Sequence, residues 1–453
     1  MGRWKVFGIA LMLATVVGGT WLLTQHEAPP TWTLPDGTTI VLRAVTRNPN
    51  HFCRYGTNFI DFLYPFVPKK YRNRFRFNVA DIGPTLGTED WLVVWLEQRG
   101  PPTPRGNRPL TCLVSIADEN GIESQLPHGM SHRFGNLATT GWELWTFPRD
   151  IFPRGGRTID IRLYVFNPTN SSLSLVGRCA EPNRTRRAGP TWRSEPAPAT
   201  RRTNGLEITL VSLESGLTAK ESGVGWAVPE AKTASRATFE MRENGRPTTN
   251  WEVMSINLSK AGASWCYRAR PVTRWQNDQQ VVSFPVGMWP ESGWKMAVEV
   301  SRTARFPPEA LWTVKGLPVP VANAKIELSI MTNLYGTELK LISVSPRRTN
   351  DTFAGHTIIY PPYARLHALA SPSLSGLRLT LLAVKDDHGR EAQLDRFNLA
   401  WSGGAPSAEG FLFGFIVPEG ARSLEATFAL SVSPTVEFSV KPVLAGSAEP
   451  PAH

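Results

Sequence analysis

The chain has 453 residues, which is too long for one ordinary hydrophobic core and predicts about three domains. Only 19% of the residues are charged, so a disordered polyelectrolyte is excluded. The 49 basic and 38 acidic residues give a net charge of +11, and about +9 remains when Arg3 and Lys5 are left out. A basic exterior favours anionic partners but specifies none.

The first predicted element is a membrane anchor in residues 1–25. Residues 6–23 form an uncharged run that, as a helix, would cover about 27 Å of a hydrocarbon core about 30 Å thick. Arg3 and Lys5 precede the run and no positive charge follows closely, which places the N-terminus in the cytoplasm. The absence of an A-x-A site favours an uncleaved signal anchor over a cleaved signal peptide. We therefore expect a single-pass inner-membrane protein with its bulk in the periplasm.

The rest of the chain is predicted to be all-β, because short alternating runs are separated by turn signals and no helical stripe is visible. The stretch 411–442 shows the pattern in two runs, 424–430 and 436–440, with a break at Ser433-Pro434. Three landmarks recur in the same order. A glycine opens an amphipathic strand, a second glycine marks a hairpin turn, and a proline stands six residues before an inward-facing residue. The three sets are Gly37, Gly121, Pro153 and Ile159; Gly205, Gly262, Pro290 and Met296; and Gly336, Gly389, Pro418 and Leu424.

A repeat of roughly 130 residues is too long for a solenoid and indicates tandem domains. The predicted layout is a first domain at 30–182, a linker at 183–204, a second domain at 205–320, a third domain at 321–446 and a tail at 447–453. The first domain carries an insertion of about 31 to 34 residues relative to the other two.

The combination of a glycine-led strand, a D-x-G hairpin and F-x-x-P-x-G-x-φ-x-φ resembles bacterial immunoglobulin-like modules. The third domain, with DDHG and FIVPEGARSLEATFAL, is the most similar. More loosely, the chain resembles bacterial membrane-anchored proteins built of tandem immunoglobulin-like β-sandwich modules. This resemblance implies three such domains after the anchor, and it implies no catalytic residue.

The insertion of the first domain interleaves aromatic and basic residues. Its candidate binding residues for an anionic surface are Lys69, Lys70, Arg72, Arg74 and Arg76. They could contact anionic lipid close to the anchor or pair with another polyanion. We favour the plainer interpretation, in which the aromatic rings cap the core and the charges face water. Nucleic acid is not expected as a partner of an exported chain.

A tryptophan-rich middle distinguishes the second domain. Trp251, Trp265 and Trp275 are candidate ligand-facing aromatics, and they would bind glycans if they lined a groove instead of a core.

Other clusters suggest metal chemistry only weakly, and no metal or cofactor is predicted. His128 and His132 are four residues apart in what is expected to be a loop. The acidic clusters at 118–120 and 386–388 fall at predicted hairpin turns, where acidic residues are ordinary. The four cysteines, Cys53, Cys112, Cys179 and Cys266, have no zinc spacing, and the three in the first domain cannot all pair with one another.

The function predicted from these features is non-enzymatic: a membrane-anchored envelope protein with a structural role or a role in binding other envelope proteins. No nucleophile elbow, zinc-protease motif, P-loop or dinucleotide fingerprint is present. The alternative is an envelope hydrolase whose site is assembled between domains from residues that no linear motif reveals.

Overall fold

A computed structural model describes most of the chain after residue 28. The described residues are 29–47, 51–55, 64, 66–72, 78–82, 91–100, 112–124, 133–136, 141–149, 152–167, 172–183, 192–223, 231–260, 266–269, 271–320, 324–346, 350–353, 356–359, 363–372, 374, 376–394, 399–401 and 409–447. The anchor expected in residues 1–25 lies outside them. Among the described residues, no helix has both the length and the hydrophobicity of a membrane span.

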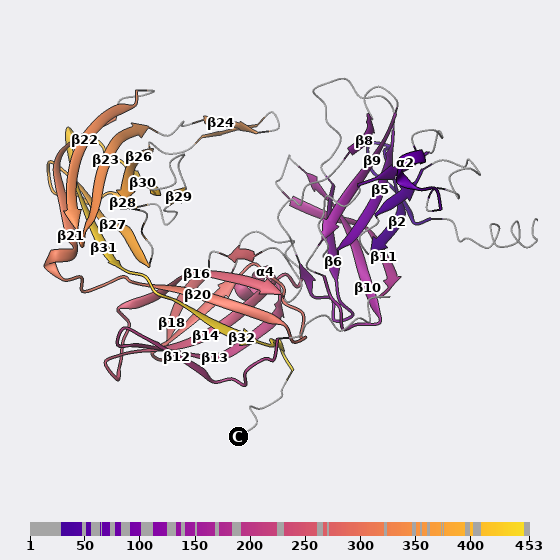
Figure 1. Ribbon diagram of the computed structural model, residues 1–453. Helices are drawn as coiled ribbons and strands as arrows, with labels where there is room; N and C mark the ends of the chain where they lie inside the picture. Colours follow the sequence, from indigo (N-terminus) through magenta and orange to yellow (C-terminus); the bar gives the residue numbers. More distant parts are fainter. Residues whose placement is uncertain are drawn as a thin grey trace, which may run out of the picture.

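The expected all-β fold is confirmed, and the sheets pack in pairs that form three units along the molecule (Figure 1). In the first unit one sheet has the order β1 (Thr31–Thr33), β2 (Thr39–Arg47), β5 (Leu92–Arg99), β9 (Trp142–Arg149) and β8 (Arg133–Asn136). The facing sheet has the order β11 (Ser172–Pro182), β10 (Thr158–Asn167), β6 (Cys112–Ala117) and β7 (Glu123–Ser124). Leu42, Val94 and Ile161 belong to the core between them.

The insertion of the first unit adds a second, smaller core. Its strands β3 (Phe52–Arg54) and β4 (Val79–Asp81) pair with each other, and a short helix α2 (Lys69–Arg72) lies between them in sequence. Cys53 and Ala80 pack against Trp95, which is on β5. The strands on either side of the basic and aromatic segment therefore cover one face of the first sheet.

The second unit also has two sheets. The first has the order β12 (Ala199–Thr203), β13 (Leu206–Leu217), β14 (Ala234–Glu243), β19 (Gln279–Phe284) and β18 (Val272–Gln276), joined by β15 (Arg246–Pro247) beside β14 and β33 (Val443–Leu444) beside β13. The second has the order β17 (Cys266–Ala269), β16 (Trp251–Lys260), β20 (Trp294–Arg302) and β32 (Thr435–Val440). A short helix α4 (Ala219–Ser222) follows β13. Phe239 and Phe438 meet in the core with ring centroids 6.3 Å apart.

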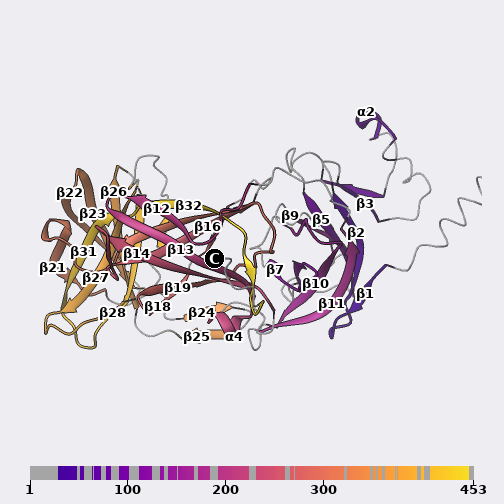
Figure 2. The same ribbon diagram turned by 90° about the horizontal axis from the view of Figure 1, so that it is seen from below.

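The third unit pairs a three-stranded sheet with a larger one. The smaller sheet has the order β21 (Leu311–Pro318), β31 (Ser423–Val432) and β27 (Leu377–Asp386), and a 3-10 turn, η3 (Pro308–Ala310), precedes β21. The larger has the order β22 (Ile326–Leu334), β23 (Thr337–Pro346), β26 (Tyr363–Ser371), β30 (Glu409–Ile416) and β28 (Gln393–Leu394), with β29 (Leu399–Trp401) also beside β30. A separate hairpin joins β24 (Asn350–Phe353) to β25 (His356–Ile359). Seen from below, the second unit lies between the other two (Figure 2).

The buried residue that follows the proline landmark is found in all three units, whereas Gly262, the hairpin glycine expected in the second unit, lies outside the described residues. Ile159, Met296 and Leu424 are each at most 1% exposed, and each lies on an inner strand of its sheet: β10, β20 and β31. The hairpin turns of the first and third units also match. Asp118 and Asp386 each accept two backbone N–H groups through one carboxylate oxygen, at 3.0 and 2.8 Å in both turns.

The second and third units exchange strands. In the first unit β10 pairs with β11, the strand that follows it in sequence. By contrast, β20 of the second unit pairs with β32, from the C-terminal end of the chain, while β31 of the third unit pairs with β21. Each unit thus receives the strand that follows the inner strand of the other, and in Figure 1 β31 and β32 form a nearly continuous ribbon that crosses between them.

This exchange corrects the predicted boundary between the second and third domains. The strand at 311–318, assigned to the domain ending at 320, belongs with the third unit, and the strand at 435–440, assigned to the domain 321–446, belongs with the second. Alternation identifies a half-buried strand but not its hydrogen-bonding neighbour.

The predicted linker at 183–204 also needs correction. Its last part forms β12, and Glu195 is bonded to β32: its N–H donates to the Ser439 carbonyl at 2.8 Å, and its carboxylate accepts the Ser439 N–H at 3.2 Å. The segment at 192–198 is therefore docked on the second unit and does not act as a free spacer.

Polar contacts hold the crossing point in place. The Glu299 carboxylate accepts from Ser255 at 2.6 Å, from Ser433 at 3.0 Å and from Arg378 of the third unit at 3.2 Å. Burial alone would raise the pKa of Glu299, but the Ser255 hydrogen bond and the Arg378 charge hold that pKa below its usual value. The Val300 N–H donates to the Pro434 carbonyl at 3.0 Å, so the backbone between β31 and β32 is also fixed.

Replacing Phe438 with alanine tests the exchange. The ring is fully buried in the core of the second unit, so Phe438→Ala should destabilise that unit by about 3–5 kcal/mol although residue 438 follows the third unit in sequence. The measurement is hydrogen exchange by mass spectrometry on the full chain at increasing denaturant, which compares peptides of the second unit with peptides of the third. Glu437→Ala, at a half-exposed neighbouring position, is the control and should cost less than about 1 kcal/mol. Loss of stability in the third unit alone would contradict the assignment.

Candidate functional site

Buried polar side chains of the described residues gather where the first unit meets the second. The contact is made by the hairpin turn at 118–123, here called the docking turn, and by the loop at 285–293, here called the receiving loop. Within the docking turn, Asp118 accepts the N–H groups of Asn120 and Ile122, and Gly121 has a φ of +75°. These bonds fix the turn, because a left-handed residue favours glycine and the aspartate replaces a backbone acceptor.

Ile122, at the end of the docking turn, inserts into the second unit. It is fully buried and belongs to the core of that unit. Its carbonyl accepts the indole N–H of Trp289 at 3.0 Å, and the next N–H, that of Glu123, donates to the Lys232 carbonyl at 3.0 Å. A Cβ at Gly287 would lie 2.2 Å from the Glu123 carbonyl oxygen, so the receiving loop needs glycine at this close approach.

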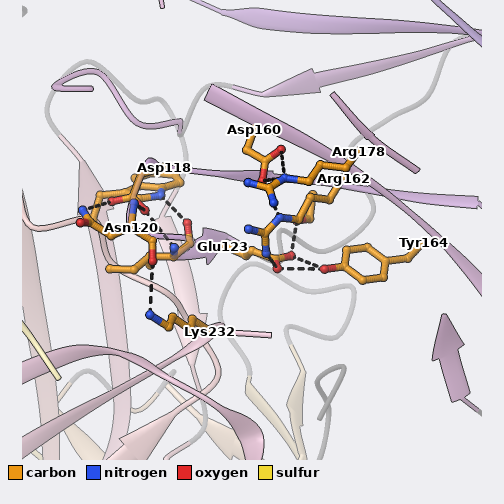
Figure 3. Close-up of polar contacts among 11 residues, drawn as sticks. Asp118, Asn120, Glu123, Asp160, Arg162, Tyr164, Arg178 and Lys232 are labelled. Atoms are coloured by element: carbon orange, nitrogen blue, oxygen red, sulfur yellow. Dashed lines mark hydrogen bonds and ion pairs between the residues drawn. The ribbon is translucent and has the colours of Figure 1, made fainter. Parts of the chain in front are cut away.

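A network inside the first unit supports the docking turn (Figure 3). Glu123 is fully buried, and its carboxylate accepts from Ser115, from Arg162 and from the Tyr164 hydroxyl, the last at 2.8 and 2.9 Å. Burial, and then the charge of Glu123, raise the pKa of Tyr164 above its usual range, so the phenol remains a hydrogen-bond donor. A carboxylate that water cannot reach and that is held by three donors is suited to fixing a turn and not to proton transfer with a substrate.

The same network continues to the surface of the first unit. Arg162 also donates to Asp160 at 2.8 Å, and Asp160 accepts from the largely exposed Arg178 at 2.9 Å. Two arginines thus face two carboxylates, and the buried charge is compensated.

A second contact between the units involves Lys260, Glu291 and Arg154. The backbone N–H of Arg154, in the first unit, lies 3.3 Å from each oxygen of the Glu291 carboxylate. Lys260 donates to the same carboxylate, and its ammonium lies 4.6 Å from the centre of the Trp294 ring and 5.5 Å from that of Trp289. Burial lowers the pKa of Lys260 to about 8, while the Glu291 charge opposes that shift.

The basic residues of the insertion divide into inward and outward positions. Arg72 stacks on the Tyr64 ring at 4.2 Å and pairs with Asp81 at 3.4 Å, so its charge is already compensated. Lys70 is exposed beside Tyr71, and Phe66 is 81% exposed. The side chain of Lys69 and the whole of Arg74 and Arg76 lie outside the described residues.

The candidate aromatics of the second unit do not form a common surface in the described residues. Trp251 is a core residue with 7% of its surface exposed, which corrects the expectation that it faces a ligand. Trp275 is half-buried on the edge strand β18, and Trp265 lies outside the described residues.

The acidic clusters are turn residues in the structure. The ligand atoms of Asp386, Asp387 and His388 lie within 4.8 Å of one another. However, the Asp386 carboxylate also pairs with the Arg390 guanidinium and caps the turn backbone, as Asp118 does in the first unit. His128 and His132 lie outside the described residues.

Two of the cysteines are seen as free thiols, Cys53 and Cys179. Burial raises the pKa of Cys53 to about 12, which makes it a packing residue and not a nucleophile. The side chains of Cys112 and Cys266 lie outside the described residues.

No protein-family model matches the chain, and no curated protein matches it.

The sequence predicts the docking turn as a hairpin, but it does not predict that this turn contacts the second unit. The one available signal is Ile122 itself, an apolar residue directly after a hairpin glycine, where the third unit has Arg390. An isoleucine at a turn expected to face water indicates a partner surface.

Shortening Ile122 should loosen the junction. Ile122→Ala removes contacts in the core of the second unit and should weaken docking by about 2–5 kcal/mol. Hydrogen exchange measured by mass spectrometry on the peptide spanning 118–124 should then speed up at least about 30-fold, because the Glu123 N–H loses its bond to Lys232. The control is Glu119→Ala, at an exposed position of the same turn. Unchanged exchange in Ile122→Ala would contradict the docking role.

Proposed function

We propose that the chain is a non-enzymatic, membrane-anchored envelope protein in which three immunoglobulin-like β-sandwich domains act as a rigid scaffold for binding other envelope proteins. The observation that carries this proposal is the nature of its two junctions. One is made by Ile122 inserted into a neighbouring core, and the other by two exchanged strands. Both use core packing and backbone hydrogen bonds, whereas domains joined by flexible linkers share few contacts.

The chemistry of the buried charges supports the same proposal. Glu97, Glu123 and Glu299 are each held by arginines or by several hydrogen-bond donors. Groups that are already paired in this way stabilise geometry and offer no unpaired acid or base to a substrate.

The position of the first unit supports anchoring. The uncharged run ends at residue 23 and the described fold begins at Pro29, so the connecting segment can span at most about 20 Å. The first unit would therefore lie against the membrane. Phe66, Lys70 and Tyr71 are exposed on its insertion, and an aromatic ring beside a lysine suits the interface of an anionic membrane.

Photo-crosslinking in living cells tests the scaffold. A crosslinking amino acid placed at the exposed positions Leu175, Met331 or Tyr335 should give a discrete adduct with another envelope protein from at least one face. Ile122→Asp should abolish an adduct with any partner that contacts both the first and the second unit. Alkaline carbonate should leave the chain in the membrane fraction. Release of the chain from membranes, with no adduct from any position, would overturn the proposal.

Vesicle binding tests the lipid contact. All three proteins keep residues 1–28 and are added to vesicles from micelles. The double substitution Phe66→Ser and Lys70→Ser should weaken binding to anionic vesicles at least about fivefold relative to the unaltered protein, since one lysine near the surface contributes about 1 kcal/mol. Lys315→Ser, an exposed lysine on the third unit, is the matched control. Equal binding by all three proteins would contradict the lipid contact.

A further inference from the structure

The junction between the first two units contains a titratable pair that the docking turn does not require. Lys260 is on β16 and Glu291 is on the receiving loop, and both belong to the second unit. The side chain of Lys260 is 4% exposed, and two tryptophan rings cover it. An alkyl side chain would fill the same apolar site without the cost of burying a charge.

The first unit acts on this pair directly. The Arg154 N–H reaches both oxygens of Glu291, and a Cβ at Gly155 would lie 3.2 Å from one of them, so the segment at 153–155 covers the carboxylate. The Arg154 guanidinium also brings a positive charge close enough to disfavour a second one on Lys260. Among the described residues, the charge of Glu291 raises the pKa of Lys260 and that of Arg154 lowers it.

From this geometry we infer that protonation of Lys260 loosens the junction between the first and second units, so that docking is tighter at alkaline pH. Undocking removes the positive charge of Arg154, and this change favours the protonated lysine. The docked state therefore binds the proton less tightly than the undocked state, and protons oppose docking.

The sign and the range follow from linkage. The Lys260 pKa is lowered in the docked protein to about 8, against a value of 10.5 for a free lysine. Docking therefore becomes more favourable as the pH rises from about 8 towards the higher pKa that Lys260 has in the undocked state. The docking equilibrium constant can rise at most about tenfold per pH unit, because one proton is released.

Amide exchange at two inter-unit hydrogen bonds measures this effect in the full chain in detergent. The probes are the peptides containing the N–H groups of Glu123, bonded to Lys232, and of Arg154, bonded to Glu291. Their protection factors, corrected for intrinsic exchange at each pH, should rise severalfold between pH 7.5 and 9.5 in the unaltered protein. In Lys260→Met, which cannot be charged, and in Lys260→Arg, which is always charged, they should be independent of pH.

The matched control is Lys295→Met on β20, where the lysine pairs with Glu437 away from the docking turn and is 30% exposed. This variant should retain the full pH dependence. A flat profile in the unaltered protein, or a profile that persists in both Lys260 variants, would overturn the inference. The proposed scaffold function would stand in that case, because its test depends on crosslinked adducts and membrane anchoring and not on pH.

Discussion

Backbone hydrogen bonds between β20 and β32, and between β21 and β31, are the constraint on which the arrangement of the second and third units depends. Each inner strand pairs with a strand that directly follows the inner strand of the other unit in sequence. The two units therefore cannot separate without removing a strand from a sheet of each. The Glu299 contacts then add specificity at the point where the two segments cross.

The junction between the first and second units is made by a hairpin turn that also occurs in the third unit. The first and third units have the same aspartate-capped turn, with the same pair of backbone bonds to Asp118 and to Asp386. In the first unit the residue after the glycine is Ile122, which enters a neighbouring core, whereas in the third it is Arg390, which pairs with its own aspartate. One side chain therefore decides whether this turn is a surface hairpin or a contact between units.

Local features of the sequence were predictable, and choices of distant partner were not. Ile159, Met296 and Leu424 could be placed on buried strands because alternation and turn chemistry act within about ten residues. The Ser433-Pro434 break predicts two strands of one domain, but a break does not show whether the chain turns back or continues into a different sheet. Trp289 and Ile122 are 167 residues apart, so no local pattern joins them. The Lys260 site was not predictable for the same reason. A lysine at the end of a strand is expected to face solvent unless the residues that bury it are known.

The position of β32 and β33 near the C-terminus determines the order in which the chain can be completed. Synthesis proceeds from the N-terminus, so the sheet that contains β16 and β20 waits for residues 435–440, and β13 waits for its parallel neighbour at 443–444. The second unit is thus started before the third and finished after it. Until then β20 has an open edge, which is the kind of surface that attracts wrong partners. A nascent chain that has not yet reached residues 435–440 therefore presents the unpaired edge of β20 to its surroundings.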